Sequence, residues 1–239
     1  MPSGTGLNME AVPDWDSVFR SLESYRKAYL SDSSVPPGEK QDPSVTAISG
    51  QYARDPWAVL VSTIISLRTK DEVTSRSSRA LLKKAPGPKD LLKLDEEEIA
   101  RLIYPAGFYR TKAASLKKIA SILNEQYGGS VPPDMDKLLA LPGVGRKTAN
   151  LVLTEAFDID AICVDVHVHR ICNRAGWIES AGPEETEMLL RQQLPRKYWK
   201  RINALLVLYG QQVCRPVSPF CSKCVISAHC LRRGVERKR

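Results

Sequence analysis

The chain has 239 residues, of which 43% are apolar, and this composition indicates a folded globular protein rather than a disordered one. Lys and Arg number 35 against 27 Asp and Glu, so the formal net charge is +8. The excess positive charge is spread along the chain and favours a polyanionic partner such as nucleic acid, although a scattered positive surface also serves solubility.

Membrane-crossing and secretion signals are both missing from the sequence. No stretch approaches the roughly 20 apolar residues that a bilayer crossing needs. Residues 1–13 also lack the basic-then-apolar pattern of a signal peptide. We therefore expect no membrane partner and a cytoplasmic location, associated with the nucleoid if the source is prokaryotic.

The N-terminal part predicts a tail, a helix and a loop. Residues 1–13 form the tail, and residues 14–30 carry Val18, Leu22, Tyr25 and Tyr29 at helical spacing. Residues 31–42 are rich in Ser, Pro and Gly, which predicts a loop.

From Trp57 onward, apolar residues recur every three or four positions, which predicts a series of helices. Asp95 and Glu98 form a capping pair for a helix that ends near Tyr104. Residues 111–127 predict a helix that displays Lys112 away from its apolar face, with Gly128-Gly129 as its stop. Further helices are predicted at residues 136–141, 146–157, 165–175, 183–194 and 198–213. Only residues 161–164 resemble a strand, so the predicted fold class is all-α.

Residues 138–149 place a Pro-Gly-X-Gly turn between two apolar segments and predict a helix-hairpin-helix. Gly143 and Gly145 can adopt positive φ, and without Cβ atoms they let a phosphate approach the amides at the start of the second helix. We expect Leu141 and Val144 to pin the hairpin to the core. The alternative is an ordinary glycine-rich connection between two helices.

Lys147 and Asp165 are the candidate catalytic pair. Lys147 lies in the first turn of the helix after the hairpin, where the helix N-terminus disfavours a cation and favours the free amine. Such a lysine is a nucleophile only if a partner can take its proton, and is otherwise a phosphate contact. Asp165 follows a short apolar run and opens a helix, so it is a candidate for this partner and for an N-cap. His167 and His169 share one helix edge, which favours structural or phosphate-facing roles.

Four cysteines crowd into the last tenth of the chain as a C-x6-C-x2-C-x5-C array of Cys214, Cys221, Cys224 and Cys230. One short C-x2-C flanked by longer gaps favours a 4Fe-4S cluster over zinc, and zinc over disulfides. Cys163 and Cys172 lie outside the array and are expected to be buried apolar residues. Arg215, Lys223 and Arg232 are among the basic residues around the array that are expected to reach the DNA backbone.

The chain closely resembles the endonuclease III family of DNA glycosylases, and the match covers nearly everything after Trp57. The resemblance is carried by the segment Leu-Pro-Gly-Val-Gly-Arg-Lys-Thr-Ala, then Val-Asp-Val-His, and then the cysteine array. The resemblance implies two lobes with DNA held between them. One is a six-helix barrel domain at residues 49–159 that contains the hairpin. The other is an iron-sulfur cluster domain built from residues 14–48 and 160–239.

The resemblance also implies an enzyme, a bifunctional DNA glycosylase and AP lyase of base excision repair, with Lys147 as nucleophile, Asp165 as its carboxylate partner and the four array cysteines as ligands of a 4Fe-4S cluster. Oxidised pyrimidines and abasic sites in double-stranded DNA are the implied substrates, and a monomer is expected. Gly143, Val144, Gly145 and His167 are candidate DNA contacts.

Two further candidate DNA contacts depart from the family's pattern. Arg68 stands where many members carry a glutamine that fills the gap left by the flipped nucleotide, which leaves the opposite-base preference open. Phe108 stands at a second wedge position that is often leucine, and an aromatic ring there serves as an apolar plug. The alternative for Phe108 is core packing.

Two other functions remain open at this stage. In a monofunctional or mismatch-specific glycosylase, Lys147 would only bind phosphate. In a non-catalytic helix-hairpin-helix module, the cysteines would hold a metal as a structural staple, and Asp165 would only cap a helix.

Overall fold

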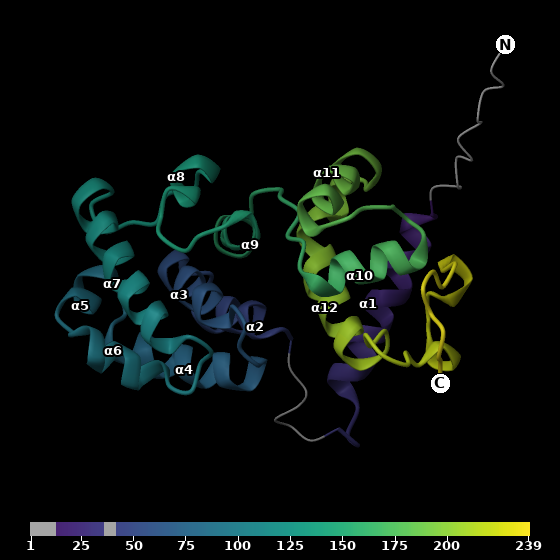
Figure 1. Cartoon of the computed structure of the whole chain (residues 1–239), viewed down its shortest axis with the longest axis horizontal. Coiled ribbons are helices and arrows are strands. Elements are labelled where there is room, and N and C mark those ends of the chain that lie inside the picture. The colour runs from purple at the N-terminus through teal and green to yellow at the C-terminus, as the bar shows by residue number, and fades with distance from the viewer. Residues whose placement is uncertain (1–12, 36–41) are drawn as a thin grey trace, which may run out of the picture. The chain divides into compact units, whose positions relative to one another are not determined.

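The computed structural model describes residues 13–35 and 42–239, and every regular element within them is helical (Figure 1). The all-α prediction is therefore confirmed, and residues 161–164 form no strand. The chain divides into two compact units. One comprises residues 34–163, and the other joins the N-terminal residues up to Ser33 with residues 164–239.

In the unit of residues 34–163, α3 (Pro56–Ser66) is buried from Trp57 to Ile65 because nearly all of its side chains are apolar or small. It packs against α2 (Ser44–Gln51), α4 (Asp71–Lys84) and α9 (Arg146–Phe157). The 18-residue α7 (Tyr109–Gln126) packs against α3, α5 (Pro88–Leu92) and α6 (Glu96–Ile103), and α8 (Met135–Leu139) contacts α9.

Local signals set the helix starts in this unit. Asp55 accepts a hydrogen bond from the Ala58 amide at 2.7 Å, and Pro56 follows it at the first helical position. The predicted cap at Asp95 is confirmed, since its side chain accepts from the Glu98 amide at 2.7 Å. Gly128 (φ +62°) and Gly129 (φ +87°) follow α7, as predicted.

The other unit joins the two ends of the chain. The predicted N-terminal helix forms as α1 (Trp15–Ser31), and its residues Val18 and Leu22 are buried. Helix α1 packs on α12 (Trp199–Gln212). Helix α10 (Val166–Ala175) packs on α11 (Pro183–Gln193) and on α12. Aromatic contacts fasten α1: Phe19 stacks on Tyr198 at 3.9 Å, and Trp15 meets Trp177 edge-on at 5.2 Å. Short 3-10 helices η1 (Arg196–Tyr198), η2 (Cys221–Lys223) and η3 (Ser227–His229) complete the unit.

The unit boundaries differ from the domain boundaries expected from the sequence. Residues 42–48 and 160–163 belong to the unit of α2–α9, whereas the sequence placed them with the cysteine array. The reason is packing, because Val45 and Ile48 of α2, together with Ala161 and Cys163, are buried in the same apolar core as α3. Residues 1–12 of the predicted tail and residues 36–41 of the predicted loop lie outside the described residues.

Within the described part of the chain, no helix combines the length and hydropathy that a bilayer crossing requires.

Candidate functional site

The predicted hairpin forms between α8 and α9. Leu141 and Val144 are buried in the core, and the Val144 amide donates to the Leu141 carbonyl at 3.1 Å, which confirms that these residues pin the turn. Gly143 adopts φ +78°, a left-handed conformation that disfavours residues with a Cβ. Gly145 was expected to share this property, but its φ is −98° with ψ 178°, because it serves as the N-cap of α9 in an extended conformation.

The surface over the hairpin is open. A Cβ added at Gly145 would meet no atom within 4 Å, and Gly143 and Gly145 are both exposed. Among the described residues, no side chain caps the N-terminus of α9. Backbone amides at an uncapped helix N-terminus form an anion-binding site, so the hairpin can accept a phosphate.

Lys147 is the second residue of α9 and is partly exposed. Within its own unit, its amine has no hydrogen-bond or ion-pair partner among the described residues. The Lys147 carbonyl accepts a hydrogen bond from the Cys163 thiol at 3.6 Å. This bond attaches the segment before Asp165 to the start of α9.

Asp165 caps α10 as predicted. Its Oδ1 accepts from the amides of His167 at 2.8 Å and Val168 at 3.0 Å, and the residue is 9% exposed. Both bonds use the same oxygen, so the cap does not engage Oδ2. Lys147 belongs to the unit of residues 34–163 and Asp165 to the other unit, and their convergence stays a prediction.

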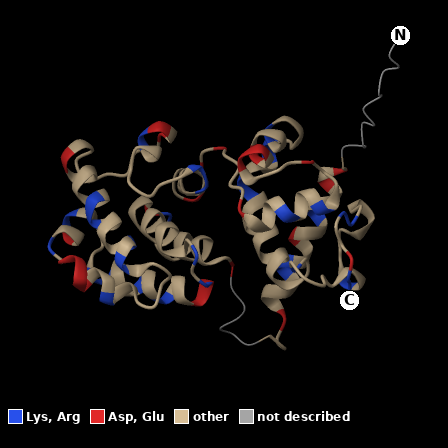
Figure 2. Ribbon diagram, viewed as in Figure 1, with Lys and Arg blue, Asp and Glu red and all other residues tan. Residues whose placement is uncertain are grey.

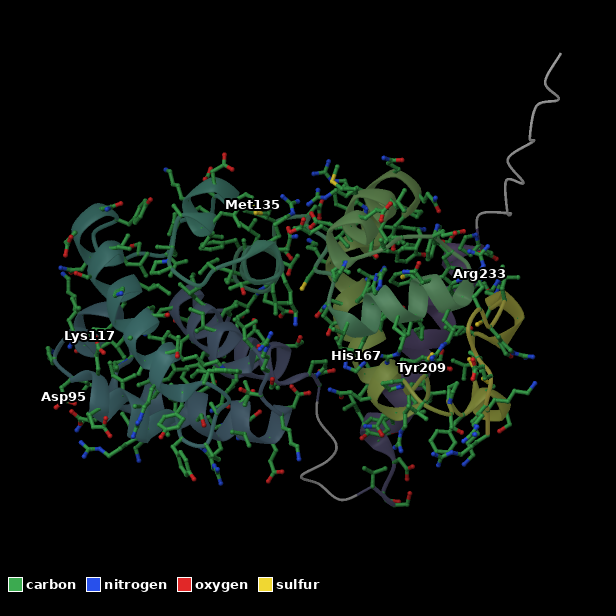
Figure 3. The ribbon with its side chains drawn as sticks, viewed as in Figure 1. Asp95, Lys117, Met135, His167, Tyr209 and Arg233 are labelled. Carbon is green, nitrogen blue, oxygen red and sulfur yellow. The ribbon has the colours of Figure 1, made fainter. Side chains whose placement is uncertain are left out.

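His167, labelled in Figure 3, is engaged within its own unit. Its Nδ1 lies 3.0 Å from Nη2 of Arg170, and a Cβ added at Gly210 of α12 would come within 2.5 Å of the same nitrogen. Gly210 is therefore the residue that lets α12 approach α10, and no sequence pattern indicated it. The role of His167 in DNA binding stays a prediction. His169 bonds Thr186 at 2.8 Å and joins α10 to α11, in line with a structural role.

Arg68 and Phe108 form one surface pair, although they come from different turns. The Arg68 guanidinium lies 5.5 Å from the centre of the Phe108 ring, and Phe108 is 62% exposed, which rules out core packing for it. Both residues have positive φ, +53° and +56°. Such conformations are strained for residues with side chains and are often found at functional sites.

The sequence was wrong about Lys112, which was expected on the open face of α7 but is 7% exposed. Its ammonium donates to the carbonyls of Ile65 at 2.7 Å and Leu67 at 2.6 Å, and to Oγ1 of Thr69 at 2.9 Å. Burial lowers the pKa of Lys112 from 10.5 to about 8. A lysine one turn away from an apolar stripe gives no sequence signal of such burial.

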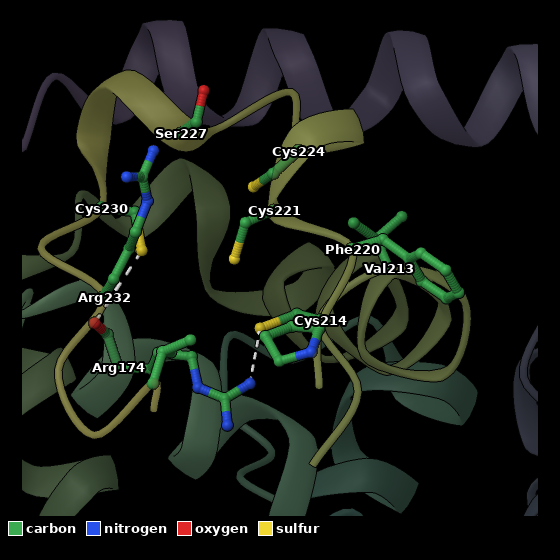
Figure 4. Close-up of a pocket in the computed structure, with 11 residues that line it drawn as sticks. Arg174, Val213, Cys214, Phe220, Cys221, Cys224, Ser227, Cys230 and Arg232 are labelled. Carbon is green, nitrogen blue, oxygen red and sulfur yellow. Dashed lines mark hydrogen bonds between the residues drawn. The ribbon is translucent and has the colours of Figure 1, made fainter. Parts of the chain in front are cut away.

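The four array cysteines line a single pocket, whose empty space, including the part open to solvent, is about 320 Å³ (Figure 4). Arg174 of α10 donates to Sγ of Cys214 at 3.3 Å, and the Cys230 thiol donates to the Arg174 carbonyl at 3.8 Å. Burial raises the pKa of Cys224 and Cys230. In residues 13–35 and 42–239, no group of three or more His, Cys, Asp or Glu side chains is gathered so as to hold a single metal ion.

The remaining cysteines behave as predicted. None of the six cysteines forms a disulfide, and Cys163 and Cys172 are buried. Burial raises the pKa of the Cys172 thiol far above its usual range, as in an unreactive core position.

Lys and Arg residues are distributed over both units (Figure 2). In the C-terminal segment of residues 213–239, which carries the array cysteines, the guanidiniums of Arg215 and Arg239 lie over the Phe220 ring, at 5.1 and 4.8 Å from its centre. These two cations therefore lie against Phe220, one of the residues that line the pocket of the array cysteines.

Lys112 makes the free energy of unfolding depend on pH. Its pKa is lower in the folded chain than in the unfolded one, so between about pH 8 and 10.5 the unfolded state binds more protons and stability rises with pH. We expect the stability of the native protein relative to Lys112→Met to rise by up to about 3 kcal/mol across this window. Urea unfolding of both proteins at pH 7, 8, 9 and 10 measures this difference, and a flat or falling difference contradicts the burial of a charged Lys112.

Comparisons with known proteins agree with this geometry. The profile of the HhH-GPD superfamily of base excision DNA repair proteins matches residues 61–196, more than half of the chain. Endonuclease III of Thermotoga maritima is 46% identical over 183 residues, which cover 75% of this chain and 86% of that protein. Endonuclease III homolog 1, chloroplastic, of Arabidopsis thaliana is 45% identical over 73% of this chain, which spans 48% of that longer protein.

Similar architecture occurs in a solved structure described as a trapped endonuclease III–DNA covalent intermediate. It matches with a TM-score of 0.74 and 28% identity, over 91% of this chain and 96% of that chain. The chain thus matches this family in both sequence and fold, and it also contains the hairpin, the lysine that follows it and the cysteine pocket. The chain belongs to the HhH-GPD superfamily of base excision DNA repair proteins and is a DNA glycosylase/AP lyase.

Proposed function

We propose that this chain removes oxidised pyrimidines from double-stranded DNA and nicks the resulting abasic sites, with Lys147 as the nucleophile and Asp165 as its partner. The observation that carries the proposal is the place of Lys147 in the first turn of α9, beside an open, uncapped anion-binding hairpin. A phosphate held by the hairpin brings the neighbouring sugar within reach of the lysine amine.

The mechanism follows from these groups. The damaged base is extruded from the stack, and the Lys147 amine attacks C1′ of its sugar while the bond to the base breaks and the base leaves with the electron pair. Asp165 accepts the proton that the amine loses. The C1′–O4′ bond then breaks, O4′ takes back the proton held by Asp165, and a protonated Schiff base forms between Lys147 and C1′. Loss of a proton from C2′ and cleavage of the C3′–O bond nick the strand by β-elimination.

The local structure around Asp165 supports its part in this reaction. Capping α10 through Oδ1 holds the carboxylate rigidly and leaves Oδ2 out of the cap. Only two peptide bonds separate Asp165 from Cys163, whose thiol bonds the Lys147 carbonyl. The chain that leads into Asp165 is therefore anchored at Cys163 to the start of α9.

Arg68 and Phe108 would enter the DNA at the lesion. Phe108 is an exposed aromatic ring suited to unstack bases, and Arg68 beside it would fill the space of the extruded nucleotide. His167 would contribute through its place next to the Asp165 cap. We expect the protein to act as a monomer, in the cytoplasm beside the nucleoid if the source is prokaryotic.

Cys214, Cys221, Cys224 and Cys230 would hold a 4Fe-4S cluster. The donor set fits, since four thiols face one pocket and the Arg174 guanidinium places a positive charge beside Cys214 Sγ. When bound, the cluster supplies a multivalent cross-link between the end of α12 and the C-terminal loop. The backbone already attaches this loop to α10, because the Leu231 amide donates to the Ala175 carbonyl at 3.0 Å.

The nucleophile is tested by borohydride trapping on a duplex with one abasic site. The native protein should give a covalent adduct, because borohydride reduces the Schiff base to a stable amine. Lys147→Gln should give none, whereas Lys118→Gln, which removes an exposed lysine of α7, should trap like the native protein. Trapping by Lys147→Gln at the native level would show that another amine is the nucleophile.

Asp165→Asn separates an enzyme from a DNA-binding module. Asn caps a helix about as well as Asp, so its amide oxygen can keep both bonds to the start of α10. We expect base release to fall by about a hundredfold or more, the usual scale for a lost general base, with unchanged affinity for abasic-site DNA and an unchanged melting temperature. Native base-release rates in this variant would assign Asp165 to the cap alone.

The cluster is tested by the visible spectrum and metal content of freshly purified protein. We expect a yellow-brown chromophore with about four irons per chain. Cys221→Ser should lose the colour, and Cys172→Ala, which changes a buried cysteine outside the pocket, should keep it. A colourless native protein with stoichiometric zinc would contradict the 4Fe-4S assignment.

A further inference from the structure

The surface pair of Arg68 and Phe108 is assembled from two turns that are distant in sequence. Arg68 lies between α3 and α4, and Phe108 directly precedes α7. Each residue holds a left-handed conformation that a side chain disfavours. Such a pair persists only if the surrounding contacts determine its geometry.

The two turns are in direct contact behind the pair. A Cβ added at Gly107 would lie 2.4 Å from the Arg68 carbonyl oxygen, so only glycine allows this approach. The Gly107 amide donates to Oγ1 of Thr69 at 3.1 Å. The residue before Phe108 is thus bonded to the residue after Arg68.

The buried ammonium of Lys112 is hydrogen-bonded to the contact between these two turns. Two of its acceptors, the carbonyls of Leu67 and Ile65, lie at the C-terminal end of α3, where helix carbonyls lack intrahelical partners. Its third acceptor is Oγ1 of Thr69, the atom that also accepts from Gly107. The ammonium therefore holds the backbone before Arg68 and the Thr69 side chain after it, and Thr69 in turn is bonded to the turn that carries Phe108.

The acceptors of the Lys112 ammonium among the described residues are all uncharged. Helix α3 carries no titratable side chain, and burial is the cause of the lowered pKa of Lys112. Burying an ammonium is costly unless its protons are bonded, and here it has three acceptors for three protons. Each acceptor would lose one donor if the ammonium were removed.

We infer that Lys112 is a positioning residue for lesion recognition, which holds Arg68 and Phe108 side by side so that they enter the DNA as one unit. The inference rests on the proposed function. Without the ammonium, the residues around Arg68 can relax from their left-handed conformation, and Arg68 no longer faces the Phe108 ring. The step that suffers is extrusion of the damaged base, since the reacting amine belongs to Lys147 on α9.

The chain provides a matched control on the same helix. Lys117, labelled in Figure 3, is partly buried on α7 and its ammonium donates to the Leu92 carbonyl at 2.9 Å and to the Leu94 carbonyl, at the end of α5. Lys117→Met therefore removes a lysine that binds helix-terminal carbonyls, but at a site with no contact to Arg68. It reports the cost of a general weakening of α7.

The experiment is a double-mutant cycle on single-turnover base excision, with a duplex that carries one oxidised pyrimidine. We expect Lys112→Met to lower the rate about tenfold, Lys117→Met to stay within about twofold of native, and Arg68→Ala to lower the rate as well. The Lys112→Met/Arg68→Ala double variant should be no slower than Arg68→Ala within about twofold, because both changes remove the same geometry. Thr69→Val, which keeps the shape of the side chain but removes Oγ1, should show a smaller loss of the same kind.

Three outcomes would overturn the inference: native rates in Lys112→Met, equal losses in Lys112→Met and Lys117→Met, or additive losses in the double variant. If Lys112→Met does not fold, Thr69→Val decides, and native excision by that variant would reject the coupling through Thr69. Failure of the native protein to excise the base or to be trapped on an abasic site would instead reject the proposed function. Borohydride trapping by Lys112→Met at the native level on an abasic site should show that the Lys147 chemistry is intact.

Discussion

Helix ends impose the constraint on which the functional parts of this protein depend. The first four amides and the last four carbonyls of every α-helix lack partners within the helix, and burying them unpaired is costly. This chain meets that requirement differently at three helix ends. The end of α3 is paired with the ammonium of Lys112, the start of α10 with the carboxylate of Asp165, and the start of α9 has no side-chain cap among the described residues.

The contrast between α9 and α10 separates binding from chemistry. At α9, glycines replace a capping side chain, so the amides at the helix start face open space and suit an external anion. At α10, the cap is itself the candidate catalytic carboxylate, and its two amide bonds restrict its motion. A mobile carboxylate would need to be ordered in the transition state, whereas a capped one is ordered in advance.

Two of the seven non-glycine residues with positive φ in the described part of the chain lie where the protein would act on the DNA stack. Arg68 and Phe108 both have positive φ, and the close contact of their turns requires a glycine at position 107. The Lys112 side chain is buried and its pKa is lowered, so keeping its ammonium charged at neutral pH lowers the free energy of unfolding. A core built only for stability would carry an apolar side chain there, so the buried lysine is better explained by the surface geometry that it maintains.

The sequence by itself determined the features that depend on neighbouring residues. Apolar spacing located α1 and α7 to α12 within two residues, although it did not predict α2. Asp95 and Asp165 marked helix starts, and Leu141 with Val144 marked the buried side of the hairpin. The cysteine spacing likewise predicted the four residues that line one pocket. These signals are local, because a cap, a turn and an apolar stripe each act within one or two helical turns.

Tertiary packing alone decided the rest. Lys112 and the Ile65 carbonyl are 47 residues apart, and neither carries a sequence signal for the other. The same is true of Gly210, which lets α12 approach His167, and of the assignment of α2 to the unit of residues 34–163. Residues 143 and 145 are both glycine, yet only Gly143 has a left-handed backbone conformation, because Gly145 is the extended N-cap of α9. Such outcomes depend on which elements meet in space, and local propensity carries no information about that.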